Sequence, residues 1–176
     1  MIFKRGQKQS RDDDDDDDDD EDEEDEDDRD YVLFQGATNG VNPDLQANTR
    51  LLQVGLKPAK TLITDALESR AEMIRLEPKG QIAQAAFFVD GVPSNAQRLP
   101  GQLALAITQT LKLLGGMDPK QKAKAQTGGL HAEFNGKKYE IRLDTAPLQG
   151  GAERLIVRIR DKAFKLEKPE EIGFSE

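Results

Sequence analysis

From Asp12 to Asp28 every residue is acidic, a run of 17 carboxylates that no packed core can accommodate. Adjacent like charges repel one another, and a run without apolar side chains has nothing to bury, so we expect it to be disordered. Residues 1–30 hold 18 acidic and 5 basic side chains, whereas residues 31–176 hold 16 acidic and 20 basic ones. The net charge of −9 therefore divides into −13 on a predicted disordered acidic tail at 1–30 and +4 on the remainder.

Three roles are open for this tail. It could be a solubilising segment, an interaction arm for a basic partner, or an intramolecular cover for the positively charged remainder. In the last case it would act only through charge, and its contacts would weaken as salt shortens the Debye length. The lysines predicted to be its neighbours are Lys112, Lys120, Lys122, Lys124, Lys137 and Lys138.

The composition excludes several kinds of catalytic and metal site. The chain has no cysteine, which removes disulfides, thiolate metal sites and cysteine nucleophiles. Its single histidine, His131, cannot form a histidine-rich metal site and is expected on the surface of a strand. The phosphate-binding pattern G-x-x-x-x-G-K-[ST] is absent, because Gly136-Lys137 stands in a hairpin turn and is followed by Lys138. These observations predict a chain that is not an enzyme, with no catalytic residue, no metal and no cofactor of its own.

Nucleic acid and membrane insertion are also disfavoured as partners. The lysines between 112 and 138 are not interleaved with aromatic residues, so base stacking has no platform, and the tail opposes a polyanion. No apolar run approaches 18 residues, so no direct membrane insertion is expected. A cytoplasmic protein that binds other proteins is the prediction that remains.

Turn residues and hydrophobic periodicity divide residues 31–176 into elements. We expect a linker with local order at 31–56, a helix from near Pro58 to 70, and strands at 71–78 and 82–90, with a hairpin turn at Asp90-Gly91. A second helix should run from Pro100 to the glycines at 115–116, followed by strands from 129 that turn at Asn135-Gly136 and a final strand at 154–160. This order predicts an α+β domain, an antiparallel sheet with helices packed on one face.

The same periodicity selects a core, because helix stripes and alternate strand positions face one shared interior. The residues predicted to be largely buried are Leu62, Leu67, Ile74, Phe87, Val89, Leu103, Ile107, Leu111, Ile141, Leu143 and Val157.

A series of motifs in this part resembles the type II secretion and type IV pilus assembly ATPases. RAEMIRLEP, from Arg70, is similar to the ASDIHIEP signature of that family, and FFVDGV is similar to its YRIDGV. LKLLGGMD at 111–118, QTGG at 126–129, IRLDTAPLQGGAERLIVRI at 141–159 and EEIGF at 170–174 follow in the family's order. The residues that match these motifs are Ala71, Ile74, Glu77, Pro78, Asp90, Gly91, Pro147, Glu153, Gly173 and Phe174.

The resemblance implies a PAS-like N-terminal domain over 57–174, whose family partner is a RecA-like ATPase domain within a hexameric motor. It implies a non-catalytic interaction and assembly role in protein secretion or pilus biogenesis, with the ATPase activity residing in a C-terminal domain that this sequence lacks. Its partners would be a secretion or pilus ATPase or an inner-membrane assembly platform, in a homo-oligomer at the cytoplasmic side of that membrane. ATP is implied only where an ATPase domain is joined or docked.

The family's arginines reach the nucleotide bound on the ATPase domain, and two of them have counterparts here. Arg142 and Arg158 are therefore the candidate nucleotide contacts by resemblance, because a guanidinium fork binds phosphate through charge and paired hydrogen bonds. The alternative is that both are exposed strand arginines paired with Glu140 or Glu153.

Other positions depart from the family pattern. Met73 and Arg75 replace its Asp and His, and its remaining arginines correspond to Ala86, Phe88 and Gly129. These losses favour an alternative function, a stand-alone adaptor or regulatory protein that binds a protein partner without nucleotide.

Overall fold

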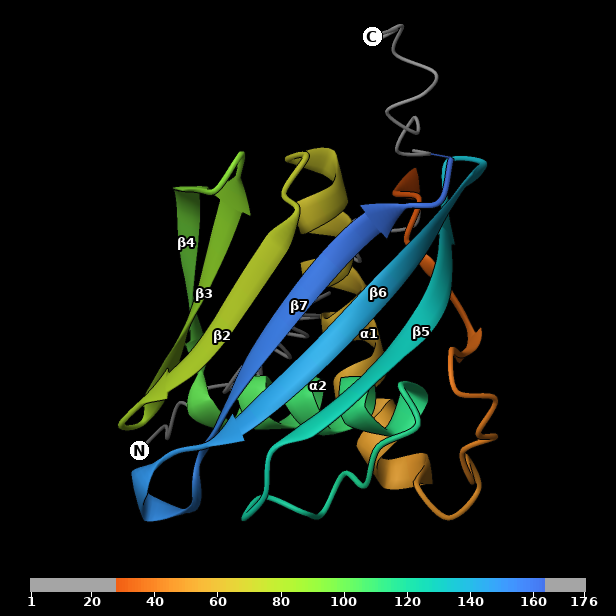
Figure 1. Ribbon diagram of the computed structural model, residues 1–176. Coiled ribbons are helices and arrows are strands. Elements are labelled where there is room, and N and C mark those ends of the chain that lie inside the picture. The colour runs from red at the N-terminus through yellow and green to blue at the C-terminus, as the bar shows by residue number, and fades with distance from the viewer. Residues whose placement is uncertain (1–27, 164–176) are drawn as a thin grey trace, which may run out of the picture.

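The computed structural model describes residues 28–163, which form two layers (Figure 1). One layer is a seven-stranded sheet in the order β1-β5-β6-β7-β2-β3-β4, with every neighbouring pair antiparallel. Two helices cover one face of the sheet, and the other face is turned toward the viewer in Figure 1. The predicted α+β class, an antiparallel sheet with helices on one face, is confirmed. The acidic residues before Asp28 lie outside the described part of the chain.

The elements follow the sequence expectation closely in the C-terminal two thirds of the chain. The helices are α1 (Thr49–Glu68) and α2 (Gly101–Leu114), and Gln149–Gly151 form the short 3₁₀ helix η2. The strands are β1 (Leu33–Ala37), β2 (Met73–Lys79), β3 (Ile82–Val89), β4 (Val92–Pro100), β5 (Gln126–Phe134), β6 (Lys137–Pro147) and β7 (Glu153–Asp161).

Two tight turns close hairpins at the predicted dipeptides. Asn135 and Gly136 have φ of 50° and 75°, and Asp90 and Gly91 have φ of 52° and 75°. Positive φ at both central residues gives the two-residue turn whose twist matches antiparallel strands, and Asn-Gly and Asp-Gly adopt it most readily. At the second turn, the backbone N–H groups of Asp90 and Gly91 donate to the two carboxylate oxygens of Glu72, at 3.1 and 2.5 Å.

The first helix differs from the prediction, because it begins at Thr49 and holds Pro58 in its interior. The part of the helix before the proline is also packed, since Gly55 is buried. The free energy gained by this packing outweighs the local cost of an interior proline. The carbonyl that Pro58 leaves without its helical donor belongs to Val54, a residue that is 60% exposed, so water can satisfy it.

Residues 31–56, predicted as a linker with local order, are integrated into the domain. They supply β1, which pairs with β5, and the first part of α1. The N–H of Val32, a fully buried residue, donates to Thr64 Oγ1 at 3.0 Å. Arg29 Nη2 lies 2.5 Å from Asp65 Oδ1 and 2.9 Å from Glu68 Oε2, and these carboxylates raise the pKa of the guanidinium.

The core lies between the sheet and the helices, as the periodicity predicts. The predicted residues that are buried are Leu62, Ile74, Phe87, Ile107, Leu111, Ile141, Leu143 and Val157. Leu67, Val89 and Leu103 are only partly buried and pack against the rim of that core.

The two helices approach each other closely at Gly55, and we expect Gly55→Ala to lower the free energy of unfolding by about 1–2 kcal/mol. A Cβ there would clash with Thr110 Oγ1 and lie 2.6 Å from the backbone oxygen of Ala106 on α2. Because backbone atoms of Ala106 cannot move aside easily, the overpacking cost should be about 2–3 kcal/mol, which exceeds the gain of about 1 kcal/mol in helix propensity. Urea unfolding measures the change, and Gly36→Ala, where a Cβ meets nothing within 4 Å, is the control. Equal or higher stability of Gly55→Ala would contradict the close approach.

Candidate functional site

Strand alternation places a set of charged side chains on the face of the sheet that the helices leave open. On β2, Ile74 and Leu76 point into the core, so Arg75 and Glu77 point outward. The same alternation turns outward the polar residues of β6 and β7, which flank Leu143 and Val157. We call the outward arginines of β2, β6 and β7 the arginine face; they are Arg75, Arg142, Arg154, Arg158 and Arg160.

Arg142 and Arg158, the candidate nucleotide contacts, lie opposite each other on β6 and β7. Arg158 Nη1 donates to Asp144 Oδ2 at 2.7 Å, and Arg142 Nε lies 3.5 Å from the same oxygen. The side chains of Arg142 and Arg158 are 62% and 53% exposed. One carboxylate thus neutralises part of the repulsion between two arginines while leaving most of their donors available to a ligand.

The expected alternative partners of these arginines, Glu140 and Glu153, are not the observed ones. Glu140 Oε2 lies 3.7 Å from Arg160 Nη2, and Glu153 is buried on the opposite side of the sheet. Asp144 makes the contacts instead, because it is the outward residue two positions along β6 from Arg142, diagonal to Arg158. The predicted exposure of both arginines is observed.

A second cluster on this face centres on Glu77, one of the motif residues. Arg154 Nη2 donates to Glu77 Oε1 at 2.6 Å, and Arg75 Nε lies 3.9 Å from Glu77 Oε2. The hydrogen bond from Arg154 lowers the pKa of the Glu77 carboxyl. The guanidinium of Arg75 also stacks over the ring of Phe88, with its carbon 5.4 Å from the ring centroid.

A groove of about 350 Å³ continues this cluster across β3 and β4. The residues that line it include Arg75, Glu77 and Lys79 of β2, Ala86 of β3 and Ala96 of β4. The groove and the arginine face together form a basic, open surface suited to carboxylate or phosphate oxygens.

The positions at which the sequence departs from the family's arginines belong to the same surface. Ala86 lines the groove, Phe88 lies beneath Arg75, and Gly129 pairs with Arg142 across β5 and β6. A Cβ at Gly129 would lie 3.0 Å from the side chain of Thr38, so the segment after β1 occupies the space that a larger residue would need.

Lys112 and Glu153 form a buried ion pair that sequence reasoning missed. Lys112 Nζ donates to Glu153 Oε1 at 2.8 Å and to the backbone oxygen of Gln121 at 2.5 Å, with side-chain exposures of 0% and 2% for the pair. Lys112 therefore cannot be the neighbour of the acidic tail that its charge predicted. The sequence did hint at the burial of Lys112, because it stands in α2 between Leu111 and Leu113, both of which are buried.

The remaining motif residues serve the fold. Ala71 and Ile74 are in the core, with 5% and 0% exposure, and Asp90-Gly91 forms the β3–β4 turn. Pro78 and Pro147 lie within the C-terminal parts of β2 and β6. Gly173 and Phe174 are outside the described residues.

Residues 28–163 contain neither a clustered set of metal-ligand side chains nor a helix that could span a membrane. This part of the chain holds no group of three or more His, Asp or Glu side chains arranged to bind a metal ion. Its helices are too short or too polar to span a bilayer. His131 is half-buried on β5 beside Glu140 of β6, and its buried Nδ1 has no hydrogen-bond partner among these residues.

Comparisons with known proteins agree on one family. A family model described as type II/IV secretion system protein matches residues 53–176. The type IV pilus assembly ATPase TfpB of Acinetobacter baylyi is 32% identical over 136 residues, which are 77% of this chain and 22% of that protein.

Two further relatives show the same partial overlap. The type IV pilus assembly ATPase PilB of Myxococcus xanthus is 29% identical over 61% of this chain and 19% of its own length. Type II secretion system protein E of Klebsiella pneumoniae is 29% identical over 57% of this chain and 20% of its own length. The chain thus spans about a fifth of the length of these relatives.

Proposed function

Because the chain belongs to the type II/IV secretion system protein family, we propose that it is a non-catalytic interaction and assembly domain of a type II secretion or type IV pilus ATPase. In this role it supports protein secretion or pilus biogenesis. The observation that carries the proposal is the arginine face, a rigid open sheet surface on which half-exposed arginines point away from the core. Such a surface suits docking against another protein domain that presents anionic groups.

Arg142 and Arg158 are the residues assigned to the anion in this proposal. Their backbones are held on both sides by sheet hydrogen bonding, with β5 beside β6 and β2 beside β7, so the guanidinium groups start from fixed positions. Asp144 holds them side by side without covering them. A phosphate group on a nucleotide held by the partner domain would compete with Asp144 for these donors.

The proposal implies a definite setting for the chain. Its partners are a secretion or pilus ATPase domain or an inner-membrane assembly platform, and the assembly contains several copies of the chain at the cytoplasmic side of the membrane. The PAS-like designation belongs to this proposal. ATP acts as a shared ligand only when an ATPase domain is joined or docked.

A photo-crosslinking experiment in cells of the organism that encodes the chain tests this function. A photoreactive amino acid replaces Arg142 on the arginine face, and in a matched control it replaces Val54, an exposed residue of α1 on the other face. We expect crosslinks from position 142, and not from position 54, to an ATPase domain of the secretion or pilus machinery. Loss of the chain should also reduce secretion or piliation. Normal secretion and piliation in its absence, or crosslinks confined to position 54, would overturn the proposal.

An adaptor that binds a protein without nucleotide is the second candidate. It is favoured by the pairing of both Arg142 and Arg158 with Asp144, and by the residues other than arginine at 86, 88 and 129. The two candidates differ in one measurable property. Crosslinking from position 142 should change on depletion of ATP under the first proposal and stay constant under the second.

The chain on its own is expected not to hydrolyse ATP. Its sequence has no G-x-x-x-x-G-K-[ST] loop to hold the phosphates and Mg²⁺, and positioned arginines alone do not supply that machinery. A phosphate-release assay on the purified chain checks this. Release that falls when Arg142→Gln and Arg158→Gln are introduced together would belong to the chain itself and would contradict the prediction.

A further inference from the structure

We infer that the acidic run of this chain, up to residue 27, docks on the arginine face and covers it against other acidic ligands. This inference concerns the isolated chain and does not depend on the identity of the proposed ATPase partner. The proposed docking site is the set of arginines on the open sheet face, rather than the lysine segment that the sequence alone suggested.

The charge balance of the arginine face is the first reason. Its five arginines are opposed by three outward carboxylates on the same strands, those of Glu77, Glu140 and Asp144. Each carboxylate lies within 4 Å of at least one arginine, so the arginines exceed the carboxylates by two, and the outward residues Lys79 of β2 and Lys138 of β6 add two further positive charges. Guanidinium forks match carboxylates better than ammonium groups do, because they offer paired donors in one plane.

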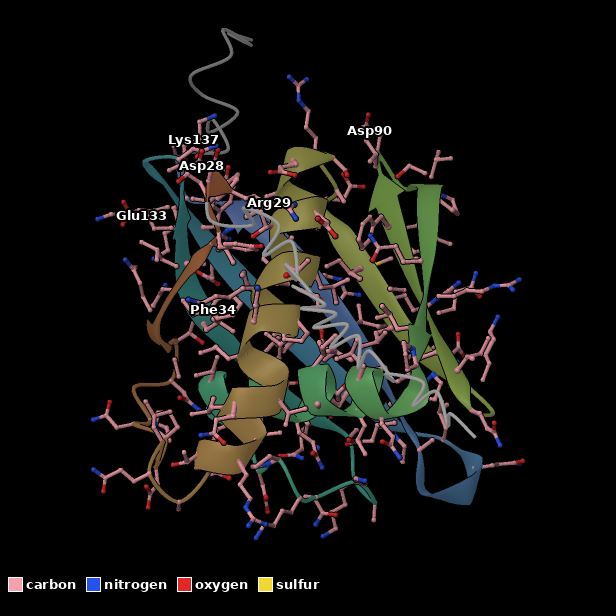
Figure 2. All side chains as sticks on the ribbon, turned by 180° about the vertical axis from the view of Figure 1, so that it is seen from behind. Asp28, Arg29, Phe34, Asp90, Glu133 and Lys137 are labelled. Atoms are coloured by element: carbon pink, nitrogen blue, oxygen red, sulfur yellow. The ribbon has the colours of Figure 1, made fainter. Side chains whose placement is uncertain are left out.

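The point at which the tail joins the domain is the second reason. Leu33 of β1 pairs with Glu133 of β5 next to the β5–β6 hairpin, and Arg29 contacts Asp65 and Glu68 of α1, so the chain enters at this end on the helix side of the sheet. Figure 2 shows Asp28 and Lys137 at this same end of the molecule. Arg160 and Glu140 lie toward this end of β7 and β6, so the tail needs only to cross the hairpin to reach the arginine face.

The length of the run is sufficient. The 16 residues at 12–27 reach on the order of 53 Å when extended, whereas the 11 residues of β6 span about 37 Å. The run can therefore pass along β6 and β7 from Arg160 to Arg154. Among the described residues, no helix lies over this face of the sheet (Figure 1).

The lysine segment is the weaker site for the same tail. Lys112 is buried against Glu153, and only Lys120, Lys122 and Lys124 remain in the loop before β5. That loop follows α2. The side chain of Gln126 hydrogen-bonds to the backbone of Asp118 and Gln121 and so fixes the first part of the loop.

A spin label in the tail tests the inference directly. The chain has no cysteine, so Asp20→Cys gives a single labelling site within the acidic run. At a salt concentration of about 0.01 M, where the Debye length is about 30 Å, we expect the label to broaden amide signals of β6, β7 and β2. At about 1 M salt, where it is about 3 Å, the broadening should disappear. Broadening centred on residues 117–125 or on α1, or none at low salt, would overturn the inference.

A mixed sample excludes contact between molecules. Spin-labelled chain without isotope is added to isotope-labelled chain without spin label, and broadening in that sample would mean that the tail docks on a second copy, which contradicts the inference. Two charge-matched variants then locate the surface. Arg142→Gln/Arg158→Gln/Arg160→Gln should abolish the broadening, and Lys120→Gln/Lys122→Gln/Lys124→Gln should preserve it.

A competition measurement tests the covering role. An oligo-aspartate peptide is the probe, and its affinity is compared between the full chain and a variant whose residues 12–27 are replaced by a neutral Ser/Asn/Gln segment of equal length. At low salt the neutral variant should bind the probe about fivefold more tightly, because the internal competitor is gone. Equal affinity in the two proteins would show that the tail leaves the arginine face free.

Discussion

Glu153→Gln is expected to lower the free energy of unfolding by about 3–5 kcal/mol, the largest effect of any single polar substitution in this domain. The new side chain has nearly the same shape, so the cost is electrostatic. Lys112, with 0% side-chain exposure, would retain its charge without a carboxylate beside it. Urea unfolding, with the slope compared between variants, measures the change.

A double-mutant cycle separates this effect from packing. Lys112→Met with Glu153→Leu removes both charges together, and the double variant should be less destabilised than the sum of the two single variants by at least about 2 kcal/mol. The oxygen of Gln121 keeps a donor in this variant, because Gln126 Nε2 also bonds to it at 3.0 Å. A coupling energy near zero would mean that the two groups act independently.

The exposed pair Arg160–Glu140 provides the matched control for Glu153→Gln. Its closest nitrogen and oxygen are 3.7 Å apart, and its side chains are 72% and 39% exposed. Glu140→Gln should therefore change stability by less than about 1 kcal/mol. If Glu153→Gln were no more costly than Glu140→Gln, the buried pair would have no structural role.

Ile107→Ala is expected to be the second large loss, about 2–5 kcal/mol. Ile107 is 1% exposed in the middle of α2, where the substitution would leave a cavity that packed neighbours on both layers cannot fill. Val89→Ala should cost less, about 0.5–1.5 kcal/mol, because Val89 is only partly buried at the rim. Thermal and urea unfolding should agree on this order.

Leu105→Ala is the control on the same helix. Leu105 lies two residues from Ile107 but is 40% exposed, so its loss should cost less than about 1 kcal/mol. An equal cost at 105 and 107 would show that α2 presents a different face to the sheet.

The β-strand order and the pairing of charged groups are the features that the sequence could not predict. The Asn135-Gly136 turn and the alternation along β7 were predictable, because a turn dipeptide and a period of two act over a few residues. The β1 strand was only suggested by YVLFQG, since its partner β5 is almost 100 residues away and a five-residue edge strand has little pattern of its own. The start of α1 was misplaced because Pro58 is a start signal locally and is tolerated inside the helix only through tertiary packing.

The candidate site divides in the same way. The family motifs gave Arg142 and Arg158 as candidate nucleotide contacts, which stays a prediction, and the alternative interpretation gave their exposure, which is observed. The sequence could not assign Asp144 as their shared partner, because that depends on which outward residue is diagonal to them in the sheet.

By itself, the sequence determined the α+β class, both hairpin turns and most of the buried residues, since side-chain periodicity and turn chemistry are properties of neighbouring residues. Only the tertiary structure decided that Lys112 is buried and paired with Glu153, 41 residues along the chain. The same is true of the arginine face, which β2, β6 and β7 assemble from distant segments. The physical reason is that desolvation and charge pairing depend on what surrounds a group in space, which packing sets after the local elements have formed.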